Sequence, residues 1–137
     1  MSTVSDGHHL APGILIVDDE PFLLALLKTV LGREGFQVYA CSSGRAAIDT
    51  FRRHSDDIRV VLLDVTMPGL DGVQTLAELR QLDPGVRACF MSGHSQRYTV
   101  EELLAQGAQR FYEKPFQIQA LAEGLRTLAC GATRRSA

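Results

Sequence analysis

The chain has 137 residues, close to the length of a single domain of about 150 residues. Hydrophobic residues make up 45% of it and charged residues 22%, a balance that excludes a disordered or fibrous chain. The 14 Lys and Arg residues and the 16 Asp and Glu residues give a net charge of −2, so we do not expect a separate basic module that binds nucleic acid through its phosphates.

The chain begins with the pattern of a buried strand followed by a helix. Residues 14–17 form a continuous apolar run, which is typical of a strand buried on both faces of a parallel sheet. Apolar side chains then recur at helical spacing, at Phe22, Leu23, Leu26, Leu27, Val30 and Leu31. Pro21 lies near the expected first position of this helix and Gly35 lies just past its expected end.

The rest of the chain repeats this alternation. We predict strands at 36–40, 60–63, 86–91 and 110–113, and helices at 46–51 (capped by Ser43), 73–79, 100–106 and 117–128. Such alternation predicts an α/β fold in which helices cover both faces of a parallel sheet. Because crossover connections are right-handed, we expect a flavodoxin-like, doubly wound sheet of five strands in the order 2-1-3-4-5.

One domain is expected to account for most of the chain. We place it at 13–129, between a flexible N-terminal segment at 1–12 and a tail at 130–137. The three cysteines are too widely spaced for a disulfide framework or a zinc site, so we expect Cys41 and Cys89 to be small buried residues. No apolar run approaches the roughly 18 residues of a membrane span and no secretory signal is apparent, so we expect a cytoplasmic protein.

Polar residues follow four of the predicted strands. They are Asp18, Asp19, Asp64, Ser92 and Lys114. In an open parallel sheet the carboxyl ends of the strands meet at one edge, where ligands bind. Carboxylates drawn together repel one another unless a cation lies among them, and Mg²⁺ suits a few carboxylates, a backbone carbonyl and retained water. A lysine and a serine hydroxyl suit the oxygens of a phosphate. We therefore predict a site for Mg²⁺, with Mn²⁺ as a substitute, and for a phosphoryl group.

Four stretches of the sequence carry a resemblance to a known family. They are 16–20 (IVDDE), 62–72 (LLDVTMPGLDG), 91–93 (MSG) and 107–116 (GAQRFYEKPF). By these stretches the chain resembles a response-regulator receiver domain of two-component signalling, over residues 13–129. The second and fourth stretches are specific to that family, and the order and spacing of all four argue against coincidence.

The resemblance implies a role for each polar residue. Asp64 would be the phosphoacceptor, taking a phosphoryl group from a sensor histidine kinase or a histidine phosphotransfer protein. Asp18, Asp19 and Asp64 would hold Mg²⁺ together with the backbone carbonyl of Thr66, while Lys114 would neutralise charge from another side. The chain would then be a signalling protein rather than an enzyme, catalysing only its own phosphorylation and dephosphorylation.

The resemblance also implies a conformational switch. The Ser92 hydroxyl would move toward the aspartyl phosphate, and Phe111, which stands where tyrosine is frequent in the family, would turn inward to fill the vacated space. This motion would change the partner preference of the surface made by the fourth helix, the fifth strand and the fifth helix. In family members the bond that corresponds to Lys114–Pro115 is commonly cis, and the sequence leaves its isomer open.

The partners follow from the same resemblance. We expect a downstream effector protein, no nucleic acid bound by this chain and no membrane, with the protein either a monomer or a homodimer promoted by phosphorylation. The sequence leaves open whether this is a stand-alone receiver, of the kind that regulates chemotaxis, or one excised from a longer regulator or hybrid kinase. Either way, the effector lies outside residues 13–129.

Three other functions share parts of the pattern. A Mg²⁺-dependent phosphatase of the haloacid-dehalogenase class also uses an aspartate nucleophile at a strand end, but it needs a second aspartate where this chain has Thr66. A flavodoxin-like electron carrier needs a loop rich in Ser, Thr and Gly after the first strand, where this chain has three acidic residues. A pseudo-receiver that binds partners without phosphorylation is the main alternative, although all five polar residues are present.

Overall fold

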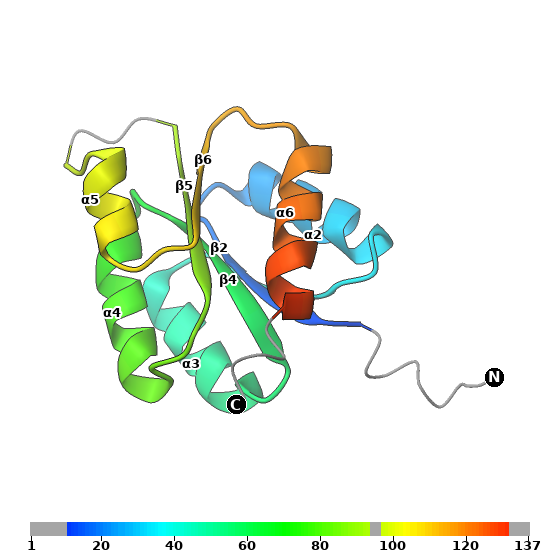
Figure 1. Cartoon of the computed structure of the whole chain (residues 1–137), viewed down its shortest axis with the longest axis horizontal. Coiled ribbons are helices and arrows are strands. Elements are labelled where there is room, and N and C mark those ends of the chain that lie inside the picture. Colours follow the sequence, from blue (N-terminus) through cyan, green and yellow to red (C-terminus); the bar gives the residue numbers. More distant parts are fainter. Residues whose placement is uncertain (1–10, 94–96, 132–137) are drawn as a thin grey trace.

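Five parallel strands form one sheet in the computed structural model of the chain, which describes residues 11–93 and 97–131 (Figure 1). The strands are β2 (Gly13–Val17), β3 (Gln37–Cys41), β4 (Ile58–Asp64), β5 (Ala88–Ser92) and β6 (Arg110–Glu113). Their order across the sheet is β3-β2-β4-β5-β6, and each neighbouring pair is parallel. Counted along the chain this is the predicted order 2-1-3-4-5, so the predicted flavodoxin-like fold is confirmed.

Helices cover both faces of the sheet. They are α2 (Pro21–Arg33), α3 (Gly44–His54), α4 (Gly72–Leu82), α5 (Val100–Ala105) and α6 (Ile118–Gly131). Helices α2 and α6 pack on one face, and α3, α4 and α5 pack on the other (Figure 1). Within the described residues, no helix is both long enough and apolar enough to span a membrane.

The central strands are apolar on both faces because each face has its own core. In β2, Ile16 packs into the core under α2 and α6, while its neighbour Val17 packs into the core under α3, α4 and α5. Successive side chains of a strand point to opposite faces, so a strand with two covered faces needs an unbroken apolar run. Cys41 and Cys89 are buried within these two cores, as predicted.

Helix α2 buries less of its apolar surface than its sequence suggests. Pro21 is its first residue, as predicted, and Leu27 is fully buried against the sheet. Phe22, however, is 90% exposed and Leu26 is 47% exposed, so the apolar residues span a wider arc than the sheet covers. The prediction of a helix is confirmed, but Phe22 and Leu26 are not part of the core.

The last helix extends beyond the predicted end of the domain. Helix α6 continues to Gly131, whereas the sequence placed the boundary at Ala129. The segments predicted at 1–12 and 130–137 lie mostly outside the described residues, so their character stays a prediction.

Candidate functional site

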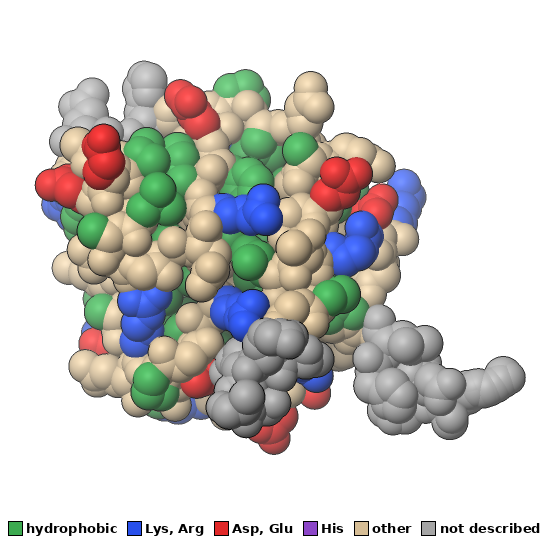
Figure 2. All heavy atoms as spheres, viewed as in Figure 1, with side chains coloured by type: hydrophobic (Ala, Val, Ile, Leu, Met, Phe, Trp, Pro, Cys, Tyr) green, Lys and Arg blue, Asp and Glu red, His purple; other side chains and the backbone are tan. Residues whose placement is uncertain are grey.

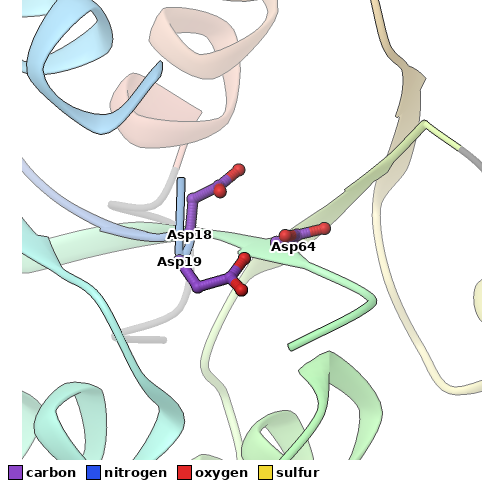
Figure 3. Close-up of side chains that lie close together, drawn as sticks. All are labelled: Asp18, Asp19 and Asp64. Carbon is purple, nitrogen blue, oxygen red and sulfur yellow. The ribbon is translucent and has the colours of Figure 1, made fainter. Parts of the chain in front are cut away.

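Adjacent strands bring three carboxylates together at one edge of the sheet. Asp18 directly follows β2 and Asp64 ends the neighbouring strand β4, in a register that pairs Val17 with Leu63. The backbone N–H of Asp18 donates to the carbonyl of Cys41 over 3.1 Å, which fixes the turn after β2. Carboxylate oxygens of Asp18, Asp19 and Asp64 all lie within 4.8 Å of one another (Figure 3).

Two of these carboxylates are buried, and this perturbs the acidity of one of them. Asp18 is fully buried and Asp64 is 4% exposed, while Asp19 is exposed to solvent. Burial, with a smaller contribution from the charge of Asp18, raises the pKa of Asp64 to about 7, although the ammonium group of Lys114 acts in the opposite direction. A cation placed among the three oxygens would lower this pKa and favour the ionised form.

Lys114 directly follows the C-terminal end of β6, and its side chain reaches the carboxylates. Its backbone N–H donates to the carbonyl of Ser92 over 2.9 Å, which continues the pairing of β5 with β6 and aims the side chain across the sheet edge. Its Nζ lies 2.8 Å from Asp18 Oδ2 and 3.6 Å from Asp64 Oδ2. The bond between Lys114 and Pro115, which the sequence left open, is cis.

The carboxylates keep Lys114 protonated. Its partial burial acts to lower the pKa, but the hydrogen bond to Asp18 and the charges of Asp64 and Glu20 outweigh that effect, so the pKa of Lys114 is raised. Glu20 Oε1 lies 3.5 Å from Nζ. The sequence reasoning gave Glu20 no role, because nothing local shows that a lysine so far along the chain approaches it.

Ser92 carries a buried hydroxyl without a hydrogen-bond partner among the described residues. Such a group is rare in folded proteins, because leaving a buried polar atom unpaired costs free energy. Beside it lies a cavity of about 240 Å³, whose walls include Ser92, Tyr98, Leu103 and Phe111. The predicted switch pair, Ser92 and Phe111, therefore borders a common space.

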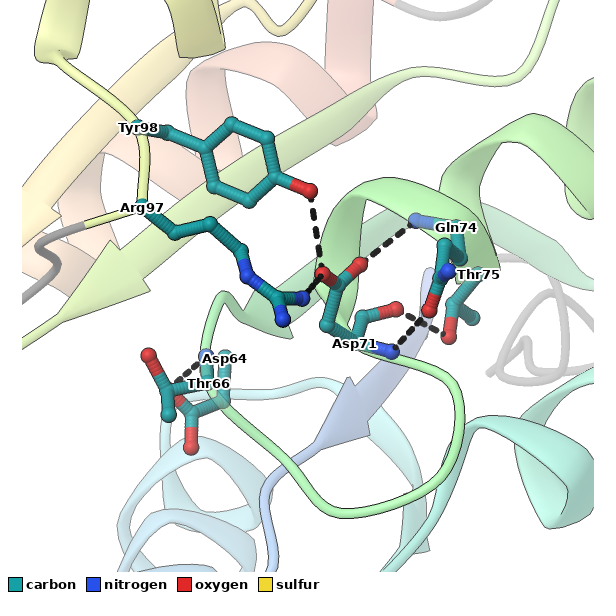
Figure 4. Close-up of polar contacts among 7 residues, drawn as sticks. All are labelled: Asp64, Thr66, Asp71, Gln74, Thr75, Arg97 and Tyr98. Atoms are coloured by element: carbon teal, nitrogen blue, oxygen red, sulfur yellow. Dashed lines mark hydrogen bonds and ion pairs between the residues drawn. The ribbon is translucent and has the colours of Figure 1, made fainter.

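Thr66 is held close to Asp64 through its backbone. Its N–H donates to Asp64 Oδ1 over 3.3 Å, and its side chain is exposed (Figure 4). This contact sets the turn that follows β4, next to the acidic cluster. The metal ligation predicted for the carbonyl of Thr66 stays a prediction.

The sequence reasoning also missed a second polar cluster beside this site. Asp71 caps α4 by accepting from the backbone N–H of Gln74, and its other carboxylate oxygen accepts from Arg97 and Tyr98 (Figure 4). A capping residue followed by Gln three positions later is a signal that could have revealed the cap. Nothing in the local sequence connects Asp71 with Arg97 or Tyr98, which lie far along the chain.

The donor set suits a hard divalent cation. Three carboxylates supply only oxygen ligands, two of them are buried on fixed strand ends, and Asp19 remains open to water. Mg²⁺ prefers a few oxygen ligands and keeps several of its waters, whereas zinc prefers nitrogen and sulfur ligands that this cluster lacks. The acidic cluster therefore fits Mg²⁺.

The geometry can be compared with known proteins. The sequence model of the response regulator receiver domain matches residues 14–126, which is most of the chain. The chain belongs to the receiver-domain family. Receivers act in two-component and phosphorelay signalling, with histidine kinases or phosphotransfer proteins and effectors as partners.

Individual receivers resemble this one over nearly their whole length. The chemotaxis protein CheY of Bacillus subtilis is 36% identical over 117 residues, covering 85% of this chain and 96% of CheY. A solved receiver domain from Clostridium thermocellum superposes with a TM-score of 0.81 at 27% identity, covering 91% of this chain and 96% of the other. CheY in a CheX–CheY–BeF₃–Mg²⁺ complex from Borrelia burgdorferi superposes with a TM-score of 0.77 at 28% identity, covering 85% of this chain and 87% of the other. This receiver is therefore CheY-like along most of its length.

Proposed function

We propose that this receiver is switched by phosphorylation of Asp64, with the phosphoryl group supplied by a phosphohistidine of a kinase or phosphotransfer protein. The observation that carries the proposal is the grouping of three carboxylates, Lys114 and the unpaired hydroxyl of Ser92 at one edge of the sheet. A structural role alone leaves no reason to bury a second carboxylate beside Asp18 and raise its pKa to about 7.

The transfer forms a bond between phosphorus and a carboxylate oxygen and breaks the bond between phosphorus and the imidazole nitrogen. A carboxylate oxygen of Asp64 attacks the phosphorus atom and forms an acyl phosphate, while the bond from phosphorus to the imidazole nitrogen breaks. The imidazole leaves with the electron pair of that bond and takes up a proton. A carboxylate is a weak nucleophile, so the rate depends on positioning and on stabilising the charge of the phosphoryl oxygens.

The residues around Asp64 supply that stabilisation. Mg²⁺ held by Asp18, Asp19 and Asp64, with the carbonyl of Thr66, would neutralise phosphoryl oxygens on one side. Lys114, whose Nζ lies 3.6 Å from Asp64 Oδ2, would exchange this contact for one with a phosphoryl oxygen. In this proposal the cluster acts only on its own aspartyl phosphate and not on an external substrate.

The Ser92 hydroxyl provides the switch in this proposal. It is buried, lacks a partner among the described residues and borders the cavity that also contacts Phe111. A new phosphoryl oxygen would offer the hydroxyl an acceptor, and its displacement would leave room for Phe111 to turn inward. New contacts made only in the phosphorylated state bias such a two-state element.

The surface that would respond lies over α5, β6 and α6. Val100 and Leu104 of α5 are 46% and 42% exposed. Figure 2 views this side of the molecule and shows hydrophobic side chains over α5, with basic side chains along the middle of the face. We propose that an effector protein, or a second copy of the chain, binds this surface after phosphorylation.

Acetyl phosphate or phosphoramidate with Mg²⁺ tests the proposal without a cognate kinase. Intact mass should show one added phosphoryl group on the wild-type protein and none on Asp64→Asn. The matched control is Asp49→Asn, which removes an exposed carboxylate from α3, distant in sequence from the site. We expect this control to be phosphorylated like the wild type.

Two results would contradict the proposal. A wild-type protein that gains no phosphoryl group in the presence of Mg²⁺ would favour the pseudo-receiver, which binds partners without phosphorylation. Undiminished labelling of Asp64→Asn would place the acceptor elsewhere.

A further inference from the structure

The carboxylate of Asp71 links the start of α4 to the segment that leads into α5. Its Oδ2 accepts from Arg97 Nη1 over 3.0 Å and from the Tyr98 hydroxyl over 3.0 Å (Figure 4). Arg97 and Tyr98 directly precede Thr99, the residue that caps α5. We call the three contacting residues Asp71, Arg97 and Tyr98 the tether.

The Asp71 end of the tether is fixed in place. The Asp71 side chain is 6% exposed, and its other oxygen, Oδ1, accepts from the backbone N–H of Gln74 over 2.8 Å. The next residue, Gly72, donates its N–H to the carbonyl of Val65 over 2.9 Å. A Cβ added to Gly72 would collide with the carbonyl of Asp64, so α4 starts in direct contact with the phosphoacceptor strand. These contacts anchor Asp71 to the strand that carries Asp64.

The other end of the tether borders the cavity that the switch would use. Tyr98 lines the 240 Å³ cavity together with Ser92 and Phe111. While its hydroxyl is bonded to Asp71, the Tyr98 ring stays in the wall of this cavity. The position of Tyr98 therefore affects the space open to Phe111.

The contacts of the tether differ in their exposure to solvent. The Arg97 side chain is 71% exposed, so its ion pair with Asp71 is screened by water. The Tyr98 hydroxyl bonds to a buried carboxylate, which loses a partner if the bond opens. We therefore expect Tyr98 to contribute more to the tether than Arg97.

We propose that the tether holds the segment leading into α5 in the resting position and thereby opposes the phosphorylation of Asp64. This inference rests on the proposed function. In this proposal the approach of the Ser92 hydroxyl to a phosphoryl group on Asp64 is accompanied by a shift of residues 97–99 toward the site, and the tether resists that shift. Breaking the tether lowers the free energy of the shifted state relative to the resting state, so the shifted state becomes more populated before any phosphoryl group arrives.

Tyr98→Phe and Arg97→Gln break the tether one contact at a time. In Tyr98→Phe we expect amide hydrogens of residues 97–103 to exchange about fivefold faster, because one hydrogen bond to a charged group restrains the opening. Arg97→Gln should show a smaller increase. The matched control is Tyr39→Phe, which removes a tyrosine hydroxyl bonded to Asp57. Tyr39 lies on β3, the edge strand on the opposite side of the sheet from β6. This control should exchange like the wild type.

The exchange measurement needs neither Mg²⁺ nor a phosphodonor, so it tests the tether separately from the proposed function. A second measurement compares the initial rates of phosphorylation by acetyl phosphate with Mg²⁺. We expect Tyr98→Phe to be phosphorylated about fivefold faster than the wild type, in proportion to its larger population of the shifted state. The melting temperature of each variant shows that it is folded.

The outcomes separate the two ideas. Exchange in Tyr98→Phe that matches the Tyr39→Phe control would overturn the tether. Faster exchange with an unchanged or slower rate of phosphorylation would overturn its role in opposing phosphorylation. If the wild-type protein is never phosphorylated, the proposed function fails even where the exchange result shows that the tether restrains this segment.

Discussion

Lys114 donates to the fully buried carboxylate of Asp18 over 2.8 Å, although the two residues lie 96 positions apart in the chain. The contact joins the ends of β2 and β6, which are not neighbours in the sheet. It gives Asp18 a compensating charge that makes its burial tolerable, and it holds the ammonium group 3.6 Å from Asp64. The same lysine therefore stabilises the acidic cluster, and in the proposed function it also contacts the phosphoryl group.

Replacing Lys114 should separate metal binding from phosphoryl transfer. We expect Lys114→Met to bind Mg²⁺ about fivefold more tightly, because a competing cation has left the carboxylates. We also expect its phosphorylation by acetyl phosphate to slow by about a hundredfold, because phosphoryl charge loses a stabilising partner. Calorimetry and intact mass measure the two effects. Weaker Mg²⁺ binding together with slower phosphorylation would show that Lys114 organises the metal site instead.

Asp19 should be required for Mg²⁺ binding. It is the exposed member of the cluster and has room for a metal ion that keeps several waters. We expect Asp19→Ala to weaken Mg²⁺ binding by at least about tenfold in calorimetry, because one of three carboxylates is lost. Glu20→Gln is the control, since Glu20 contacts Lys114 but is not part of the cluster. An Asp19→Ala protein with unchanged affinity would refute this ligand assignment.

Asp64 should lower the stability of the metal-free protein at neutral pH. Its folded-state pKa is raised from 3.8 to about 7, so between these pH values the folded protein binds a proton that the unfolded chain has released. The stability contribution of Asp64 therefore falls as the pH rises from about 4 to about 7, and it stays low above that range.

Unfolding by urea in the presence of a chelator tests this linkage. At pH 8 we expect Asp64→Asn to be more stable than the wild type by on the order of 1–3 kcal/mol, with a smaller difference at pH 5. The exposed carboxylate variant Asp49→Asn should show no such pH-dependent difference. A difference that grows as the pH falls would reverse the sign of the pKa shift and contradict the prediction.

Two apolar residues of α2 should differ sharply in their contribution to stability. Leu27 is fully buried, so Leu27→Ala should lower the free energy of unfolding by about 2–4 kcal/mol through lost burial and a residual cavity. Phe22 is 90% exposed, so Phe22→Ala should change it by less than about 0.5 kcal/mol. Denaturant unfolding measures both. A large loss for Phe22→Ala would mean that this side chain is covered in solution.

The sequence predicted the elements well but missed some of their boundaries. The strand predicted at 36–40 begins one residue later, because the N–H of Phe36 donates to the carbonyl of Leu31 and belongs to the turn after α2. The strand predicted at 86–91 begins at Ala88, because Val86 bonds back to Asp83 in a turn. Phe36 and Val86 are both buried apolar residues, so the sequence pattern included them in the strands. Their backbone N–H groups, however, form the hydrogen bonds of turns.

The grouping of the polar side chains at one edge of the sheet was predictable for a physical reason. In a parallel sheet the carboxyl ends of the strands lie at one edge, so polar residues that directly follow apolar runs must meet there. Asp18 and Asp64 needed no further information to be placed together, and the structure brings their carboxylates into one cluster with Asp19. Lys114 follows from the same rule at the end of β6.

The sequence by itself determined which strands are apolar on both faces, the order of the strands and the residues at the sheet edge, because all of these depend on local patterns and on the handedness of crossovers. Only the tertiary structure decided that Phe22 faces solvent and that Glu20 contacts Lys114. It also decided that Asp71 binds Arg97 and Tyr98. These relationships depend on how far the neighbouring elements extend and on contacts between segments far apart in the chain, which no local pattern encodes.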